Sequence, residues 1–86
     1  MNKHIKYMNG YEEWLDYDEN NNLIHSIDSN GHEQYHTYND KNQCVHTYTK
    51  THEVMYEYNE NGNIISSIFH SMTQERFKEL RNNSVK

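Results

Sequence analysis

The chain has 86 residues, of which 33% are hydrophobic and 24% are charged, and its formal net charge at pH 7 is −5. This polarity borders on that of disordered proteins, but eight Tyr, two Phe and one Trp provide enough large apolar surface for one small folded domain. The single cysteine, the lack of a signal-peptide core and the lack of a long apolar run together predict a cytoplasmic protein without disulfides and without a membrane partner.

A pattern of about 20 residues recurs three times along the chain. Its most constant part is a tyrosine followed by an Asp- or Asn-containing turn, at Tyr17, Tyr38 and Tyr58. The copies align without a gap over 11–27, 32–48 and 52–68. A repeat of this length indicates a supersecondary unit that packs against copies of itself. Because repeated units build surfaces more readily than unique catalytic sites, we expect no enzyme activity.

Each repeat predicts two strands and two turns. Bulky and polar residues alternate in the strand segments, which are rich in aromatic and β-branched residues. Asp, Asn and Gly between the segments favour tight, bulged hairpin turns. We therefore predict a mainly β fold, an antiparallel meander of about seven strands near residues 3–8, 11–17, 22–28, 32–38, 43–49, 52–58 and 63–69.

A C-terminal α-helix is expected after the strands. Ser71-Met72-Thr73-Gln74 has the pattern of a capping box. The residues placed to give the helix an apolar stripe are Phe69, Met72, Phe77 and Leu80. We expect the helix to end near Arg81 and to cover part of one sheet face or an open edge. The chain is then one domain, 1–86, with a repeat sheet over 5–69, a helix over 71–82 and a frayed tail over 83–86.

The repeat resembles a known family at this point. Tyr17-Asp18-Glu19-Asn20-Asn21-Asn22-Leu23 with the later turn Asp28-Ser29-Asn30-Gly31, and the copy from Tyr56 to Ile64, are similar to the tyrosine-aspartate (YD) repeat of Rhs and teneurin proteins. The resemblance covers most of residues 5–69 and implies a β-meander. In Rhs proteins such meanders coil into shells around toxin domains and have been linked to carbohydrate binding. The arginine of the family pattern is replaced by Asn22, Gln43 and Asn63, and three units are too few for a shell.

Cys44 is the only thiol that could act as a nucleophile. It occupies the repeat position of Leu23 and Ile64, so a buried structural cysteine is favoured over a catalytic one. No catalytic residue is assigned.

Seven histidines raise the question of a metal site. His32 and His36 fall on one strand face but about 13 Å apart, and His25 and His46 lie in successive repeats, about 10 Å apart. Neither pair can share one ion, so we expect polar sheet histidines, with pH sensitivity as an alternative. No metal ligand or cofactor is assigned.

Acidic residues are concentrated in the repeats, where residues 1–70 hold eleven acids against four lysines. Three glutamates recur on the same face as bulky residues, and further acids lie in or beside the three equivalent turns. Singly, these acids are explained by turn formation and solubility. As a set, an acidic rim beside aromatic side chains indicates an interface for a basic protein surface. The predicted partner-binding residues are Glu12, Trp14, Asp16, Asp18, Glu19, Glu33, Tyr35, Asp40, Glu53, Glu57 and Glu60.

We therefore expect a small acidic protein-binding module, an inhibitor that occludes the basic nucleic-acid-binding surface of a partner such as a nuclease. The composition resembles that of low-GC bacteria and their phages, where anti-CRISPR and toxin-immunity proteins provide an analogy. Direct binding to nucleic acid is disfavoured by the acidic body. The alternatives are a carbohydrate-binding YD-repeat module and a structural remnant of a longer repeat protein. A homodimer that shares the aromatic faces is also plausible for so small a domain.

Overall fold

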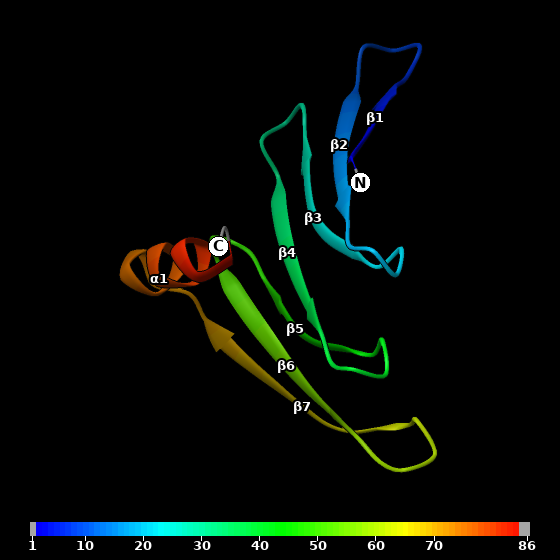
Figure 1. Cartoon of the computed structure of the whole chain (residues 1–86). Coiled ribbons are helices and arrows are strands. Elements are labelled where there is room, and N and C mark those ends of the chain that lie inside the picture. Colours follow the sequence, from blue (N-terminus) through cyan, green and yellow to red (C-terminus); the bar gives the residue numbers. More distant parts are fainter. Residues whose placement is uncertain (1, 85–86) are drawn as a thin grey trace.

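The computed structural model describes residues 2–84. These residues form one seven-stranded antiparallel sheet, in which each strand pairs with the strand before it in the sequence, followed by one helix (Figure 1). The elements are β1 (Asn2–Lys6), β2 (Glu12–Tyr17), β3 (Leu23–Asp28), β4 (Glu33–Tyr38), β5 (Cys44–Tyr48), β6 (His52–Tyr58), β7 (Ile64–Ser71) and α1 (Gln74–Ser84). The predicted meander with a C-terminal helix is confirmed.

The strand ends differ from the predicted ones by one or two residues. Tyr7 was expected inside the first strand, but its N–H donates to the carbonyl oxygen of Tyr11 at 2.9 Å, so Tyr7 belongs to the β1–β2 turn. At the other end of the sheet, β7 continues to Ser71, because this residue still pairs with His52 of β6.

The three turns that follow the repeated tyrosines share one hydrogen-bonding pattern. In the first, Oδ1 of Asp18 accepts the N–H groups of Asn20 and Asn22, both at 2.9 Å. Asn39 and Asn59 do the same in their turns. The fourth turn residue has a positive φ, which Asn and Gly tolerate best; these residues are Asn21, Asn42 and Gly62. The turn geometry therefore explains the recurring Asx residues.

The repeat lengths differ by one residue because of the turns at the opposite end of the sheet. The β3–β4 turn contains Gly31, at φ 82°, and Asp28 donates its N–H to the carbonyl oxygen of His32. The β5–β6 turn is one residue shorter, with the N–H of Thr49 bonded to the carbonyl oxygen of His52 at 2.9 Å. The one-residue difference in repeat length thus lies in a turn, so the register of the paired strands is unchanged.

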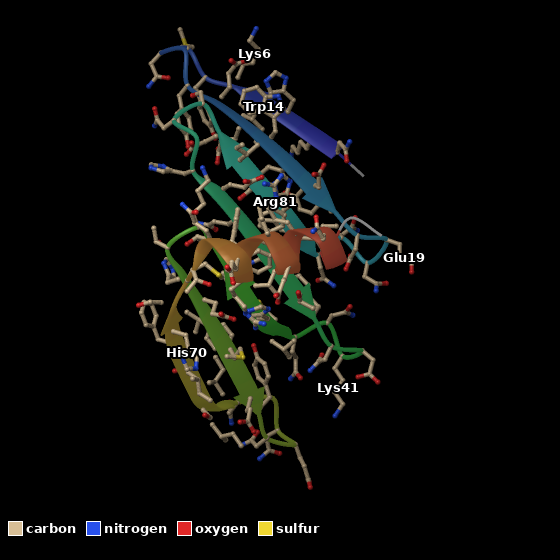
Figure 2. The ribbon with its side chains drawn as sticks, turned by 90° about the vertical axis from the view of Figure 1, so that its left-hand side faces the viewer. Lys6, Trp14, Glu19, Lys41, His70 and Arg81 are labelled. Carbon is tan, nitrogen blue, oxygen red and sulfur yellow. The ribbon has the colours of Figure 1, made fainter. Side chains whose placement is uncertain are left out.

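α1 lies across one face of the sheet, over β4, β5 and β6, and not over an edge (Figures 1 and 2). Phe77, which is 8% exposed, packs against Tyr35 and Tyr48 with ring centroids 6.1 and 5.9 Å apart. Tyr48 is 1% exposed and stacks on Tyr35 at 4.7 Å. This aromatic cluster is the centre of the core. We call the covered side of the sheet the helix face and the other side the open face.

The helix differs from its prediction at both ends. Its N-cap is Thr73, whose Oγ1 accepts the N–H of Arg76 at 3.1 Å, whereas Ser71 of the predicted capping box belongs to β7. Phe69, predicted for the apolar stripe, is also part of β7 and is 66% exposed. The helix ends at Ser84 and not near Arg81. Of the predicted tail, residues 83 and 84 are helical, and 85–86 lie outside the described residues.

Cys44 is only half-buried and therefore does not belong to the core. Its Sγ lies 3.4 Å from Oγ1 of Thr47, which in turn lies 3.0 Å from Nδ1 of His36. These three side chains stand together on the open face, because Cys44 pairs with Tyr38 and Thr47 pairs with His36. The position of Cys44 still agrees with a structural side chain in the sheet.

Candidate partner-binding surface

The hairpins of the sheet separate near the rim that carries the three Asx turns. β2 and β3 stay paired up to Tyr17 and Leu23, beside their turn. β3 and β4, in contrast, pair only at three positions, the last being His25 with Tyr35. Beyond this pair the second hairpin, β4–β5, diverges from the first, β2–β3. A groove is therefore left between successive hairpins.

The repeated tyrosines bridge this separation. The hydroxyl of Tyr38 donates to the carbonyl oxygen of Leu23 at 2.8 Å, across the first gap. In the next repeat, the hydroxyl of Tyr58 donates to the carbonyl oxygen of Cys44 at 2.6 Å. Each bond satisfies a carbonyl that the strand ladder no longer reaches. The tyrosine column thus holds the hairpins together while leaving a groove between them.

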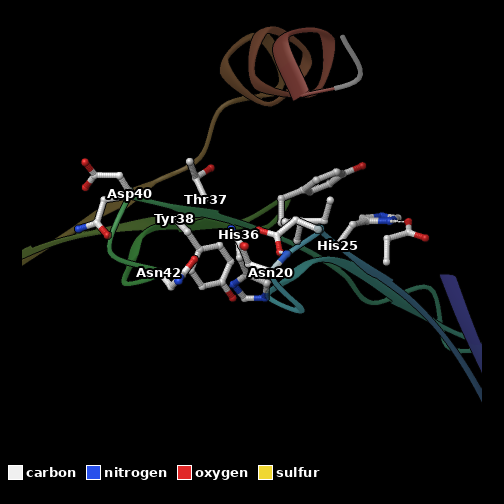
Figure 3. Close-up of a pocket in the computed structure, with 12 residues that line it drawn as sticks. Asn20, His25, His36, Thr37, Tyr38, Asp40 and Asn42 are labelled. Atoms are coloured by element: carbon white, nitrogen blue, oxygen red, sulfur yellow. Dashed lines mark hydrogen bonds and ion pairs between the residues drawn. The ribbon is translucent and has the colours of Figure 1, made fainter. Parts of the chain in front are cut away.

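The first groove, between β2–β3 and β4–β5, has a volume of about 720 Å³. We call it the acidic groove, because its charged lining residues are three aspartates and it is lined by no lysine or arginine among residues 2–84. Figure 3 shows Thr37 and Asp40 on the helix side of the ribbon, and His36, Tyr38 and Asn42 on the opposite side. The lining residues are Asp16, Asp18, Asn20, Ile24, His25, Tyr35, His36, Thr37, Tyr38, Asn39, Asp40 and Asn42.

A second groove of about 370 Å³ repeats this arrangement between β4–β5 and β6–β7. Asn39 and Asp40 line both grooves, since their turn stands between the two. The other charged residues of the second groove are Lys41, Glu57 and Glu60. The acids of the turns therefore line a series of two grooves along one rim.

Local hydrogen bonds favour the ionised form of an acid in the acidic groove. The N–H of Asn22, and less strongly that of Asn20, lower the pKa of Asp18 against a smaller opposing effect of burial. Burial acts in the other direction on the neighbouring ring, since it lowers the pKa of His36 and so favours its neutral form. Burial also raises the pKa of Tyr38. At neutral pH, the groove thus presents the Asp18 carboxylate near the neutral rings of His36 and Tyr38.

Trp14 lies beside the acidic groove, on the part of the helix face that α1 leaves uncovered (Figure 2). Its side chain is 39% exposed and stacks on the ring of His4, with centroids 4.8 Å apart and planes inclined by 10°. Glu12 and Asp16 flank it on the same strand, two residues away in each direction and therefore on the same face. Trp14 is a supported aromatic platform between two carboxylates.

The three repeated glutamates have histidine partners in the same face. His4 Nε2 lies 3.0 Å from Glu12, His25 Nε2 lies 2.7 Å from Glu33, and His46 Nε2 lies 3.0 Å from Glu53. These pairs were not predicted. They could have been predicted from the sequence, because His4, His25 and His46 recur every 21 residues. Antiparallel pairing of the predicted strands then places each histidine beside the glutamate of the following strand.

Two of these glutamates, Glu33 and Glu53, are partly or fully shielded from solvent near α1. Glu53 is 4% exposed, and Arg76 donates to both of its oxygens at 3.1 Å, which lowers the pKa of Glu53. At Glu33, burial alone would raise the pKa, but hydrogen bonds from His25 and Tyr35 outweigh it and lower the pKa. Burial and the bond to Glu33 raise the pKa of Tyr35 to about 12. Glu53 therefore belongs to the packing under α1, whereas His25 and Tyr35, the partners of Glu33, also line the acidic groove.

The predicted partner-binding residues therefore fall into three groups. The grooves gather Asp16, Asp18, Tyr35, Asp40, Glu57 and Glu60. Trp14 lies beside them, Glu19 is exposed in the β2–β3 turn, and Glu12 lies at the opposite end of β2, where its backbone bonds Ser29. Glu33 and Glu53 are held in the network under α1. The lining residues that were not predicted are chiefly amides and neutral rings: Asn20, His36, Tyr38, Asn39 and Asn42.

Within residues 2–84, no three His, Cys, Asp or Glu side chains are arranged to hold one metal ion. At His25, for example, both ring nitrogens already contact carboxylates, Nδ1 that of Asp16 at 3.0 Å and Nε2 that of Glu33 at 2.7 Å. The two carboxylates therefore lie on opposite sides of the ring and cannot share one ion with it. The described part of the chain also contains no helix that is long and apolar enough to cross a membrane.

Comparisons with known protein families and with curated proteins find no family model and no sequence that matches the chain. The function is therefore inferred from the geometry and chemistry of the rim.

Proposed function

We propose that this protein is a non-enzymatic binding module whose acidic rim takes up basic side chains of a partner protein. The observation that supports it is the acidic groove, where Asp16, Asp18 and Asp40 line one depression whose lining, among residues 2–84, includes no lysine or arginine. A carboxylate pair or triplet at a groove attracts guanidinium and ammonium groups, and charge-assisted hydrogen bonds to them are strong. The tyrosine and asparagine side chains add flat and hydrogen-bonding surface around the entering group.

The repeat gives this rim a spacing that a basic partner can match. Successive grooves are separated by two strands, which corresponds to about 10 Å across the sheet. Basic side chains about 10 Å apart and on one side occur at i and i+3 on a polyproline II segment, or about two turns apart on a helix. Asp40 stands between the two grooves and contacts both. A partner with a row of Arg or Lys side chains would engage Asp18, Asp40 and Glu60 in turn.

Such binding provides a mechanism of inhibition. Proteins that bind nucleic acid use rows of Arg and Lys to contact phosphates. A row of carboxylates on a rigid sheet occupies the same side chains and excludes the nucleic acid by occlusion. Attraction between the charges also accelerates the encounter and makes it sensitive to salt. We propose a cytoplasmic site of action, since the free thiol of Cys44 suits a reducing compartment.

The first experiment is affinity purification with the wild-type protein as bait, followed by mass spectrometry and by reconstitution with the purified partner. The variant D18N/D40N/E60Q removes one acid from each of the three Asx turns while keeping the size of the side chain. We expect it to weaken binding of the partner at least tenfold, and to abolish competition with nucleic acid in a gel-shift assay.

The matched control is E75Q/E79Q, which removes charge from exposed helix residues outside both grooves. It should bind as the wild type does. Equal losses in both variants would mean that only net charge matters, and an unchanged affinity of D18N/D40N/E60Q would remove the rim from the interface.

Carbohydrate binding is the second candidate, and Trp14 is the observation that favours it. A half-exposed indole that is backed by His4 and flanked by Glu12 and Asp16 can stack on a sugar ring while the carboxylates accept hydroxyl bonds. It is the only tryptophan, so its fluorescence reports the site directly. A shift of this emission with a glycan found on an array, together with binding of that glycan in calorimetry that is lost in W14A but kept in D40N, would favour sugar binding over the basic partner.

A further inference from the structure

β7 is an edge strand whose outer side has no partner within residues 2–84. Four of its apolar side chains are exposed: Ile64 by 55%, Ile65 by 63%, Ile68 by 44% and Phe69 by 66%. An exposed apolar edge presents unpaired N–H and C=O groups next to surface that water solvates poorly. Such a strand is well suited to pair with another strand.

β7 lacks two of the usual devices that protect an edge, charged side chains and proline, and its bulge at Ile65 has counterparts in β3 and β5, strands that are paired on both sides. Residues 61–71 include no Asp, Glu, Lys or Arg, and the chain contains no proline. α1 was expected to cover a face or an edge; it covers the face over β4–β6 and leaves the edge of β7 open (Figure 1). The opposite edge, β1, differs because two of its five residues are Lys3 and Lys6.

In the interior of the sheet, the strands that are equivalent to β7 in the repeat have this edge covered by another strand. Ile68 occupies the repeat position of Ile27 in β3 and of Tyr48 in β5. In the interior of the sheet, Ile27 pairs with Glu33 and Tyr48 pairs with Glu53, so the equivalent edges of β3 and β5 are each covered by an antiparallel strand of this same chain. Antiparallel pairing with a strand of the same chain is therefore the mode by which the repeat covers such an edge, and a second copy offers its own open β7 for this pairing.

We propose that two copies of this chain associate through β7, which pairs antiparallel with the β7 of the second copy. A two-fold axis perpendicular to the sheet satisfies this pairing and keeps both helices on the same side, so that the two sheets continue as one. Pairing of β7 with β1 of another copy would be parallel if the helices stayed on one side, and would bring Lys3 and Lys6 against apolar residues. The acidic groove is lined by no residue of β6 or β7 and stays accessible in this dimer.

The test measures the mass of the whole protein by analytical ultracentrifugation over a range of concentrations. The wild type should reach twice 10.5 kDa and no more, because the two-fold axis uses up both free β7 edges. I65K/F69K places charges on two exposed positions of β7 and should raise the dimer dissociation constant at least about tenfold, leaving a monomer with an unchanged circular dichroism spectrum.

The control is M8K/N30K, which adds the same charge at exposed turn residues of β1–β2 and β3–β4. It should remain dimeric. Hydrogen exchange supplies a second readout, since amides of 64–71 should exchange more slowly in the wild type than in I65K/F69K. Any of three results would overturn the proposal: a wild type that is monomeric up to about millimolar concentration, a mass that grows beyond two copies, or a dimer that persists in I65K/F69K.

Discussion

At the scale of single residues, two repeated columns explain why the hairpins stay together. The tyrosines at 38 and 58 donate hydroxyl hydrogen bonds across the gaps between hairpins. Histidines and glutamates form the second column, where each pair joins a strand to a neighbouring strand on the helix face. In both sets of residues, hydrogen bonds between polar groups hold neighbouring strands together, a role that the packing of aliphatic side chains has in larger domains. This is consistent with a chain that is only 33% hydrophobic.

The first prediction concerns the bridging hydroxyl of Tyr58. Y58F leaves the carbonyl oxygen of Cys44 without its bond at 2.6 Å, and should cost about 1 kcal/mol in the free energy of unfolding. Urea denaturation measures this value. Y56F is the matched control, since no hydrogen bond of the Tyr56 hydroxyl is found among the described residues, and it should be close to neutral. Equal effects of the two substitutions would contradict the role given to the bridge.

The second prediction concerns the buried carboxylate under α1. R76M removes the guanidinium that contacts both oxygens of Glu53, which is 4% exposed. The loss should be about 2 kcal/mol, less than for a fully buried pair, because the Arg76 side chain is 45% exposed and water can replace it. K78M, at an exposed position of the same helix, should leave the free energy of unfolding nearly unchanged. The double variant R76M/E53Q should recover part of the loss, since Gln carries no charge.

At the scale of elements, α1 contacts the sheet through the ring of Phe77, which packs against Tyr35 and Tyr48, and through the ion pair of Arg76 with Glu53. The sheet itself has few buried apolar residues, and Tyr48 becomes buried where Phe77 packs against it. Thr73 fixes the first turn by accepting the N–H of Arg76, which aims the helix across the strands. The helix therefore supplies the second layer that a one-layer sheet needs in order to bury a core.

The third prediction tests this contribution. F77A removes a ring that is 8% exposed and contacts both Tyr35 and Tyr48, and should cost about 3 kcal/mol or more. F69A removes the same ring at a position that is 66% exposed, and at dilute concentration it should change the free energy of unfolding by less than about 0.5 kcal/mol. Chemical denaturation of both variants, with tyrosine near-UV circular dichroism, provides the comparison. A small effect of F77A would show that the sheet is stable without its helix.

At the scale of the whole molecule, the protein is a row of hairpins that meet tightly at one end and separate at the acidic rim. Close pairing between hairpins is confined to positions such as His25–Tyr35 and His46–Met55. Hydrogen bonds lower the pKa values of Glu33 and Glu53 in the network under α1, and that of Asp18 in its turn, and so stabilise their charged form. Stability and the proposed binding surface therefore depend on pH in the same direction.

The fourth prediction is that stability decreases as the pH falls. The lowered pKa values of Glu33 and Glu53 contribute stability above about pH 4.5, which is lost as the pH falls through the folded-state pKa values. Burial also lowers the pKa of His36, so its contribution is present above about pH 6.5 and is lost as the pH falls below that value. Urea denaturation between pH 8 and pH 3 measures both effects.

His36 can be separated from the other titrating groups by substitution. H36Q retains a group that can bond Thr47 but does not titrate, so the difference in stability between wild type and H36Q should decrease below pH 6.5. The difference should be constant above that value. A difference that does not change with pH would contradict the buried, neutral state of this ring.

Much of the architecture is determined by local sequence. The Asx residues and the positive-φ positions at Asn21, Asn42 and Gly62 define the turns, and the turns with alternating strands between them define a meander. These features depend on neighbours a few residues apart, so the sequence alone indicates them. The acids of the turns likewise fall along one rim, because every second turn of a meander lies at the same end.

Only the tertiary structure decides what the side chains contact across the sheet. It shows that α1 covers a face and leaves β7 open, that Glu53 pairs with Arg76, 23 residues away, and that the hairpins separate into grooves. These outcomes depend on strand twist, bulges and the docking of the helix, which couple residues far apart in the chain. The repeat therefore predicted the meander and its acidic rim, whereas the division of the acids into buried partners and groove lining required the packed fold.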